Sequence, residues 1–312
     1  MNLYLPDGKE FMSSDIGEVK EYLSGLMRRV VRVSPDETAI VSSGRNLSLY
    51  IEGKTIPIRT SFFRKLMKWF NFPLGQIRYL DVETVASVMN DYLLNIKSQF
   101  VDITIENGEA LSITSENFGM LNDEKLISMV EPLGITKVII NDYMTAIISE
   151  EKEKIEPFPG DSFGAGISIF NSDTGFRAFT INTYLLRYVC SNGAYVKDEN
   201  FGKKYYHYNL DIEELYDGLK NSIDSLKEKK EIITERIKML KEQTNFEETK
   251  KRIADIIKMR IGKYKSDKLF EDTREINNNY DLFNHITLKA KEFGSSNRIM
   301  LEEIAGELLF MN

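Results

Sequence analysis

Residues 160–196 read GDSFGAGISIFNSDTGFRAFTINTYLLRYVCSNGAYV and form the most strand-like stretch of the chain. Two β-rich runs, Ile167–Phe170 and Phe176–Ile181, flank the residues Asn171–Gly175. β-Branched and aromatic residues favour strands, whereas Asn, Ser, Asp and Gly favour turns. The stretch therefore predicts an antiparallel β-hairpin.

Towards the N-terminus, helical and strand-like patterns are mixed. Apolar residues recur at helical spacing in four segments, 15–29, 61–70, 82–96 and 123–130. Short β-rich runs over 30–33, 38–41, 47–51 and 55–58 predict a small meander. Asn107-Gly108 predicts a hairpin between 101–105 and 110–114, and further β-rich runs occupy 137–148.

After Asn209 the composition changes, because Gly and Pro nearly vanish until Gly262. Apolar residues recur at steps of seven and predict one apolar stripe on a helix of about thirty residues. The stripe comprises Ile212, Leu219, Leu226, Ile233 and Leu240. It packs either against the next helix, 247–261, or against a second copy of the chain. Helices over 281–293 and 298–310 complete an α-rich end.

These patterns predict an α+β fold. A strand-rich mixed domain, with antiparallel hairpins, spans residues 1–208. An α-helical region with a long helical hairpin, residues 209–312, packs on it.

The composition is that of a folded globular protein, with 42% hydrophobic and 29% charged residues among 312. The single cysteine, Cys190, excludes an intrachain disulfide and a zinc site with several thiolates. The N-terminus has no leader pattern, and no apolar run is long enough to cross a bilayer. We expect a cytoplasmic protein without a membrane contact.

The sequence offers little for catalysis. Neither GxxxxGK[ST] nor a GxGxxG that opens a helix after a strand is present, so a P-loop or a dinucleotide fold is not supported. Two candidate carboxylate groups, Asp161 with Asp173 and the cluster Glu150, Glu151 and Glu153, have no spacing that makes them converge on a metal. Cys190 fits a buried, inert thiol better than a nucleophile. We expect no cofactor, no metal and no catalytic residue.

Basic and aromatic residues occur together in two places, although the net charge is −7. Between Gly53 and Leu80 there is no acidic residue, and helical spacing places Phe62, Leu66 and Phe70 on a face away from the cations. Cations beside accessible rings are typical of proteins that bind single strands by phosphate pairing and base stacking. The predicted nucleic-acid-binding residues are Arg59, Arg64, Lys65, Lys68, Trp69 and Arg78 in this patch and Arg177, Arg187, Lys203, Lys204, Tyr205 and Tyr206 in a strand-rich second patch.

The strand-like stretch also resembles a family signature. Its positions are Gly160-Asp161, Gly166, Asn171–Gly175, Arg187, Cys190 and Asn192-Gly193. This pattern resembles the phage and plasmid proteins grouped as domain of unknown function number 932. The resemblance implies a viral or mobile-element gene near replication or recombination functions, and it transfers no activity. Arg187 is the preferred functional candidate, because a hairpin does not need its charge.

The leading hypothesis is a non-sequence-specific single-stranded DNA-binding protein of a phage or mobile element, in the host cytoplasm if viral. It supports replication or recombination, with replication proteins as further partners. A scaffold protein that forms a homodimer through its long helix is the alternative, and a metal-dependent nuclease is less favoured.

Overall fold

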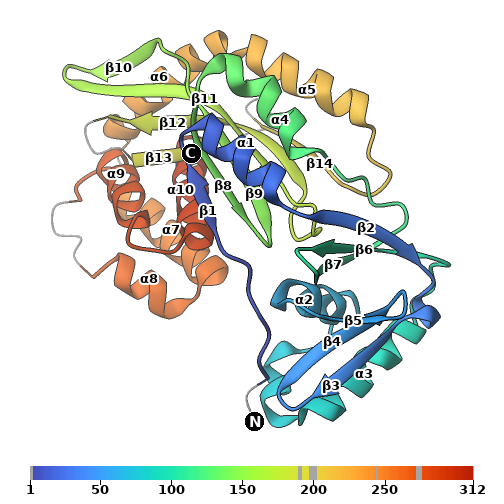
Figure 1. Cartoon of the computed structure of the whole chain (residues 1–312). Coiled ribbons are helices and arrows are strands. Elements are labelled where there is room, and N and C mark those ends of the chain that lie inside the picture. The colour runs from blue at the N-terminus through green and yellow to red at the C-terminus, as the bar shows by residue number, and fades with distance from the viewer. Residues whose placement is uncertain (1–2, 189–191, 197–201, 244, 272–275, 312) are drawn as a thin grey trace.

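The structure is a computed structural model and describes residues 3–188, 192–196, 202–243, 245–271 and 276–311 (Figure 1). Antiparallel sheets and a helical C-terminal region make up the chain, which confirms the predicted α+β class.

The central sheet is built around the strand-like stretch. Its neighbouring strands are β1 (Phe11–Ser13), β8 (Ile135–Asn141), β9 (Met144–Ser149), β11 (Asp161–Asn171), β12 (Phe179–Arg187) and β13 (Asn192–Val196). Two further strands, β10 (Lys154–Phe158) and β14 (Gly202–Tyr205), pair with β11 and β12. β9 and β10 lie end to end along β11, and β13 and β14 do the same along β12.

The predicted hairpin is confirmed and is longer than expected. β11 and β12 pair from Phe163 opposite Arg187 to Phe170 opposite Thr180. Phe176, predicted as a strand residue, belongs to the turn between them. A glycine is required inside β11, because a Cβ on Gly166 would lie 1.8 Å from the carbonyl oxygen of Ser149.

Two smaller antiparallel sheets lie beside the central sheet. One contains β2 (Arg28–Val33), β6 (Val101–Glu106) and β7 (Glu109–Ser115). The other contains β3 (Ala39–Ser43), β4 (Asn46–Ile51) and β5 (Lys54–Pro57). With α2 (Thr60–Trp69) and α3 (Val82–Leu94), these sheets enclose one hydrophobic core. We call this group of elements the N-terminal lobe.

The sequence prediction for this lobe needs one correction. The meander holds for β3, β4 and β5, but the run over 30–33 belongs to β2, which pairs with β6. α1 (Ile16–Gly25) accordingly ends before Arg29, because Arg28 and Arg29 are part of β2. Short 3-10 helices occupy Pro35–Glu37 (η1), Leu74–Tyr79 (η2) and Glu131–Leu133 (η3).

Helices cover the central sheet. They are α4 (Asp123–Val130), α5 (Ile212–Asp224), α6 (Leu226–Glu242), α7 (Phe246–Ile261), α8 (Lys263–Leu269), α9 (Asn279–Ala290) and α10 (Ser295–Leu308). α1, α4 and α5 share a core with the sheet, and α6, α7, α9 and α10 share another. α10 runs beside β13 (Figure 1).

The long helix after Asn209 is divided in two. α5 ends at Asp224 and α6 begins at Leu226, so the predicted single helix is wrong at Ser225. The apolar stripe is covered by this chain itself, since α6 packs on β10 and α9 and shares its core with α7. Of its five members, only Ile212 is exposed.

The boundary between residues 208 and 209 stays a prediction. In the part of the chain that the structure describes, no helix combines the length and the apolar character needed to cross a membrane.

Candidate nucleic-acid interface

α2 carries the cations of the first patch. Phe62 and Leu66 are fully buried in the core of the N-terminal lobe, whereas Arg64 and Lys68 are exposed on the opposite side. This confirms the division of faces predicted from helical spacing.

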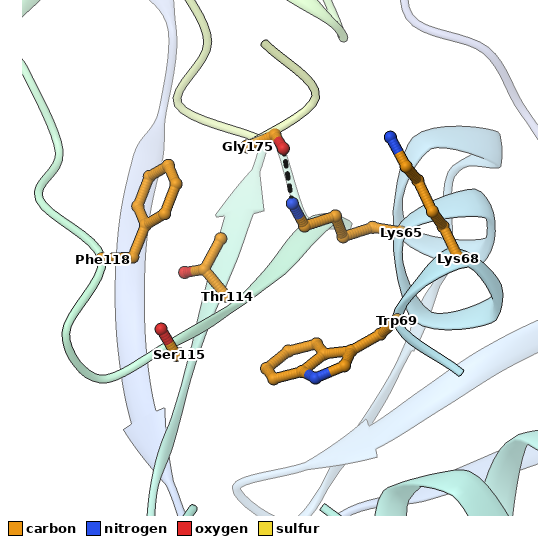
Figure 2. A pocket seen from close by; sticks show the side chains of 7 residues that line it. All are labelled: Lys65, Lys68, Trp69, Thr114, Ser115, Phe118 and Gly175. Atoms are coloured by element: carbon orange, nitrogen blue, oxygen red, sulfur yellow. Dashed lines mark hydrogen bonds between the residues drawn. The ribbon is translucent and has the colours of Figure 1, made fainter. Parts of the chain in front are cut away.

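A cavity of about 330 Å³ lies beside α2, between the N-terminal lobe and the turn that joins β11 to β12. Lys65, Lys68 and Trp69 of α2, Thr114 and Ser115 of β7, Phe118 and Gly175 line it. Figure 2 shows Trp69 and Phe118 on different walls, with the hydroxyl-bearing side chains of β7 at the floor. This volume is at the lower end of the range typical of small-molecule sites, about 300–1,000 Å³. We call it the aromatic–lysine cavity.

Lys65 fixes one edge of the cavity. Its Nζ donates a hydrogen bond of 2.6 Å to the carbonyl oxygen of Gly175 (Figure 2). Burial, with a smaller contribution from Lys68, lowers the pKa of Lys65 to about 8. Gly175 has φ of 70°, and a Cβ there would lie 2.4 Å from the Lys65 Nζ. The turn therefore favours glycine, and a side chain there would also displace the Lys65 ammonium group.

Phe118 connects the cavity to the end of β14. Its ring stacks on His207, with ring centroids 4.6 Å apart. The amide of Gly119 donates to the carbonyl oxygen of His207, and the amide of Asn209 donates to that of Asn117. Burial lowers the pKa of His207, which favours a neutral imidazole under the phenyl ring. Segments 117–119 and 207–209 thus lie side by side.

The second patch leads up to this contact. Lys203 and Lys204 are exposed on β14, and the Lys204 Nζ lies 4.7 Å from the centroid of the Tyr206 ring. Tyr206 and Tyr208 are exposed on either side of His207. Tyr205 is half-buried against the central sheet and packs near Phe179. The rings of Tyr206 and Tyr208 are therefore the accessible ones.

Three predicted arginines are already bound to carboxylates. The Nη1 of Arg59 lies 2.8 Å from both Glu106 and Asp142, its Nε also bonds to Glu109, and the residue is only 5% exposed. Because Arg59 is buried and paired, it is not available to contact a nucleic-acid strand.

The other two arginines lie away from the cavity. Arg177 forms an ion pair with Glu303 of α10. Arg187, the preferred candidate from the family resemblance, bonds to both oxygens of Asp161, and Asp161 also accepts a hydrogen bond from Tyr280. Its charge thus serves the junction between β11, β12 and α9, which sequence reasoning did not anticipate.

Arg64 and Arg78 are exposed and lie over aromatic rings, Arg64 over Tyr143 and Arg78 over Tyr79. Arg64 is on the same helix as Lys65 and Lys68, whereas Arg78 belongs to η2. Neither lines the aromatic–lysine cavity.

Of the carboxylates considered for a metal, Asp161 and Asp173 lie in separate places, whereas Glu151 and Glu153 come together on the ammonium group of Lys230. Asp161 bonds to Arg187, and Asp173 bonds to Arg28 and Asn171. Within the described ranges, no group of three or more His, Cys, Asp or Glu side chains is arranged to hold a metal ion. Cys190 lies outside the described residues.

The cavity combines residues that sequence reasoning found with residues that it missed. Lys65, Lys68 and Trp69 were predicted, whereas Phe118 and His207 were not. Phe118 follows a strand at a point where the chain turns, and an aromatic ring in such a loop is the only local signal. Its partner, His207, is distant in sequence and gives no such signal.

Comparison with protein-family models, curated proteins and solved structures found no match, and the family resemblance of residues 160–193 stays a prediction.

Proposed function

We propose that the chain binds single-stranded nucleic acid, with DNA favoured, without reading its sequence. The binding supports replication or recombination of a phage or mobile element and contains no catalytic step.

The meeting of two separate patches carries this proposal. The stacked rings of Phe118 and His207 join the α2 patch to the segment that follows β14. Lys65, Lys68 and Trp69 thereby adjoin a segment that carries Tyr206 and Tyr208 and that continues from Lys204 of β14. The sequence separates these groups by more than a hundred residues, and folding places them in adjoining segments.

The chemistry of this region suits a single strand. Each base offers a face that stacks on an aromatic ring, and each phosphate pairs with a cation, whatever the sequence. Among the residues that the structure describes, no carboxylate lines the aromatic–lysine cavity. The net charge of −7 does not oppose local binding, because ion pairs of the interior hold carboxylates such as Glu106 and Asp142.

Fluorescence anisotropy with labelled oligo-dT tests the proposal. We expect saturable binding that weakens steeply with added salt, because phosphate contacts release counterions. Lys68→Glu and Lys204→Glu are expected to weaken binding, and each neutralised contact removes about 0.7 from the slope of log affinity against log salt.

The matched control is Lys251→Glu, on the exposed surface of α7 and outside the proposed surface. It is expected to keep the wild-type affinity and salt slope. A flat titration with the wild-type chain would contradict the proposal, and an equal loss in all three variants would show that overall charge, and not this surface, attracts the strand.

A further inference from the structure

The aromatic–lysine cavity is distinguished by the residues that line it. It combines two aromatic rings on separate walls with two ammonium groups and two hydroxyls. The other two described cavities differ from it. One, lined by Arg59 and Arg28, also contains Glu106 and Asp142, and the other, beside α7 and α8, contains Glu247 and Asp267.

The rings are suited to hold a flat ligand. Trp69 is half-buried at the end of α2, and Phe118 is held in place because His207 covers one face of its ring. Figure 2 shows Phe118 and Trp69 on either side of Thr114 and Ser115. A planar heteroaromatic group that enters there contacts both rings and exchanges water for apolar surface.

The polar groups of the cavity can form hydrogen bonds with a nucleobase without distinguishing one base from another. Thr114 and Ser115 line the cavity from β7; Ser115 is half-buried, whereas the buried Thr114 hydroxyl already donates to the carbonyl oxygen of Asp102. A hydroxyl both donates and accepts a hydrogen bond, so it can meet the edge of any of the four bases. This agrees with binding that does not read sequence.

The cations place the phosphate. Lys68 is exposed at the rim, one helical turn from Lys65, whose ammonium is already bonded to Gly175. Lys68 is therefore the group that a phosphate reaches first, while a base occupies the space behind it.

We propose that the aromatic–lysine cavity is a slot for one unstacked nucleobase of the bound strand, with the adjacent phosphate on Lys68. This inference rests on the proposed function and specifies its contact. A base inside a duplex is stacked and paired, so the slot selects single strands or unpaired ends.

Trp69 is the only tryptophan of the chain and reports directly on the slot. The experiment titrates Trp69 fluorescence with oligo-dT, with a phosphodiester chain of equal length that lacks bases, and with a duplex of equal length. Oligo-dT is expected to quench Trp69 and to bind about 5- to 150-fold more tightly than the chain without bases, which corresponds to stacking of one base. The duplex is expected to leave Trp69 unquenched.

Phe118→Ala keeps the Trp69 reporter and removes one wall. It is expected to weaken oligo-dT binding about 5- to 150-fold and to leave binding of the chain without bases unchanged. Tyr264→Ala, which removes an exposed ring on α8, is the matched control and is expected to bind as the wild type does.

The outcomes separate the slot from the proposed function. Oligo-dT binding in the anisotropy assay without quenching of Trp69 would overturn the slot and keep the function. Equal affinity for oligo-dT and for the chain without bases would contradict the base slot and would show that the cavity contributes only a phosphate contact. No binding of any strand would overturn both. The comparison of strands uses the wild-type chain, so it decides the question even if Phe118→Ala fails to fold.

Discussion

The ammonium group of Lys65 lies at the edge of the aromatic–lysine cavity, between the protein interior and the proposed ligand. Burial brings its pKa to about 8, while the hydrogen bond to Gly175 keeps the group at the cavity edge. An anion bound nearby stabilises the charged form, so binding and protonation of Lys65 support each other.

Affinity for oligo-dT is therefore expected to fall as the pH rises from 7 to 9, by up to about tenfold if only the charged form of Lys65 binds. Anisotropy titrations across this range measure the effect. Lys65→Arg keeps its charge throughout and is expected to give a flat profile, with Lys68→Arg as the control that retains the wild-type profile. A flat profile in the wild type would exclude Lys65 from binding.

Gly166 is a position of the central sheet where only glycine, which has no Cβ, fits. A Cβ at this position would lie 1.8 Å from a backbone oxygen of Ser149, and backbone cannot move away as a side chain does. Gly166→Ala is expected to lower the free energy of unfolding by about 1–3 kcal/mol, measured by urea denaturation. Gly75→Ala has open space around it and is expected to change stability by less than about 0.5 kcal/mol. Similar values for both would contradict the close approach.

At the level of elements, the turn between β11 and β12 joins the central sheet to the N-terminal lobe. The Ser172 hydroxyl donates to Tyr143, and the carbonyl oxygen of Thr174 accepts from Ser112. Asp173 forms an ion pair with Arg28 at 3.0 Å. The turn therefore anchors both parts of the molecule.

Asp173 makes this anchor sensitive to pH. Burial, together with the nearby charge of Asp123, raises the pKa of Asp173 to about 7, and the Arg28 guanidinium only partly offsets this. The folded chain then holds a proton that the unfolded chain releases near pH 4. This contribution to stability is complete below about pH 4 and is lost as the pH rises through 7.

Asp173→Asn is accordingly expected to reduce the loss of stability between pH 5 and pH 8, by an amount on the order of a few kcal/mol. Thermal unfolding of wild type and variant at both pH values measures the difference. Asp217→Asn, on the exposed side of α5, is the control and is expected to keep the wild-type dependence. An unchanged dependence in Asp173→Asn would assign the effect to other groups.

Sequence patterns predicted the elements whose signals are local. Helical spacing gave α2 and α4, and turn residues gave the β6–β7 and β11–β12 hairpins. The pairing of β2 with β6 was missed because it joins residues about seventy apart in the chain. The break at Ser225 was missed because no Gly or Pro marks it.

The same limit applies to the candidate site. Lys65, Lys68 and Trp69 share one helix, so their proximity follows from its geometry. Arg59 and Arg187 looked equally available in sequence, yet each meets carboxylates from other elements. Only the three-dimensional structure identifies those partners.

At the scale of the whole molecule, buried ion pairs connect the N-terminal lobe to the central sheet. Arg59 bonds to Glu106 within the lobe and to Asp142 in the turn between β8 and β9. Arg28 extends the network from Glu106 to Asp173. Removing one member leaves the remaining carboxylates buried without compensation.

Arg59→Met is therefore expected to lower the free energy of unfolding by about 3–5 kcal/mol and to separate unfolding of the N-terminal lobe from that of the central sheet. Scanning calorimetry measures both effects. Arg29→Met breaks the exposed pair with Glu52 and is expected to cost at most about 1 kcal/mol. A single, unshifted transition in Arg59→Met would show that the network does not couple the two parts.

The wide spacing of the cavity residues along the chain has a consequence for folding. The hydrogen bond from Lys65 to Gly175 closes a loop of 110 residues, and the contact between the segments of Phe118 and His207 closes an overlapping loop of 88. Contacts of such separation form late, since their closure entropy is recovered only when the sheets are in place. A chain emerging from the ribosome thus has no complete slot until β14 has been synthesised. Quenching of Trp69 by a single-stranded oligonucleotide would report when the slot forms.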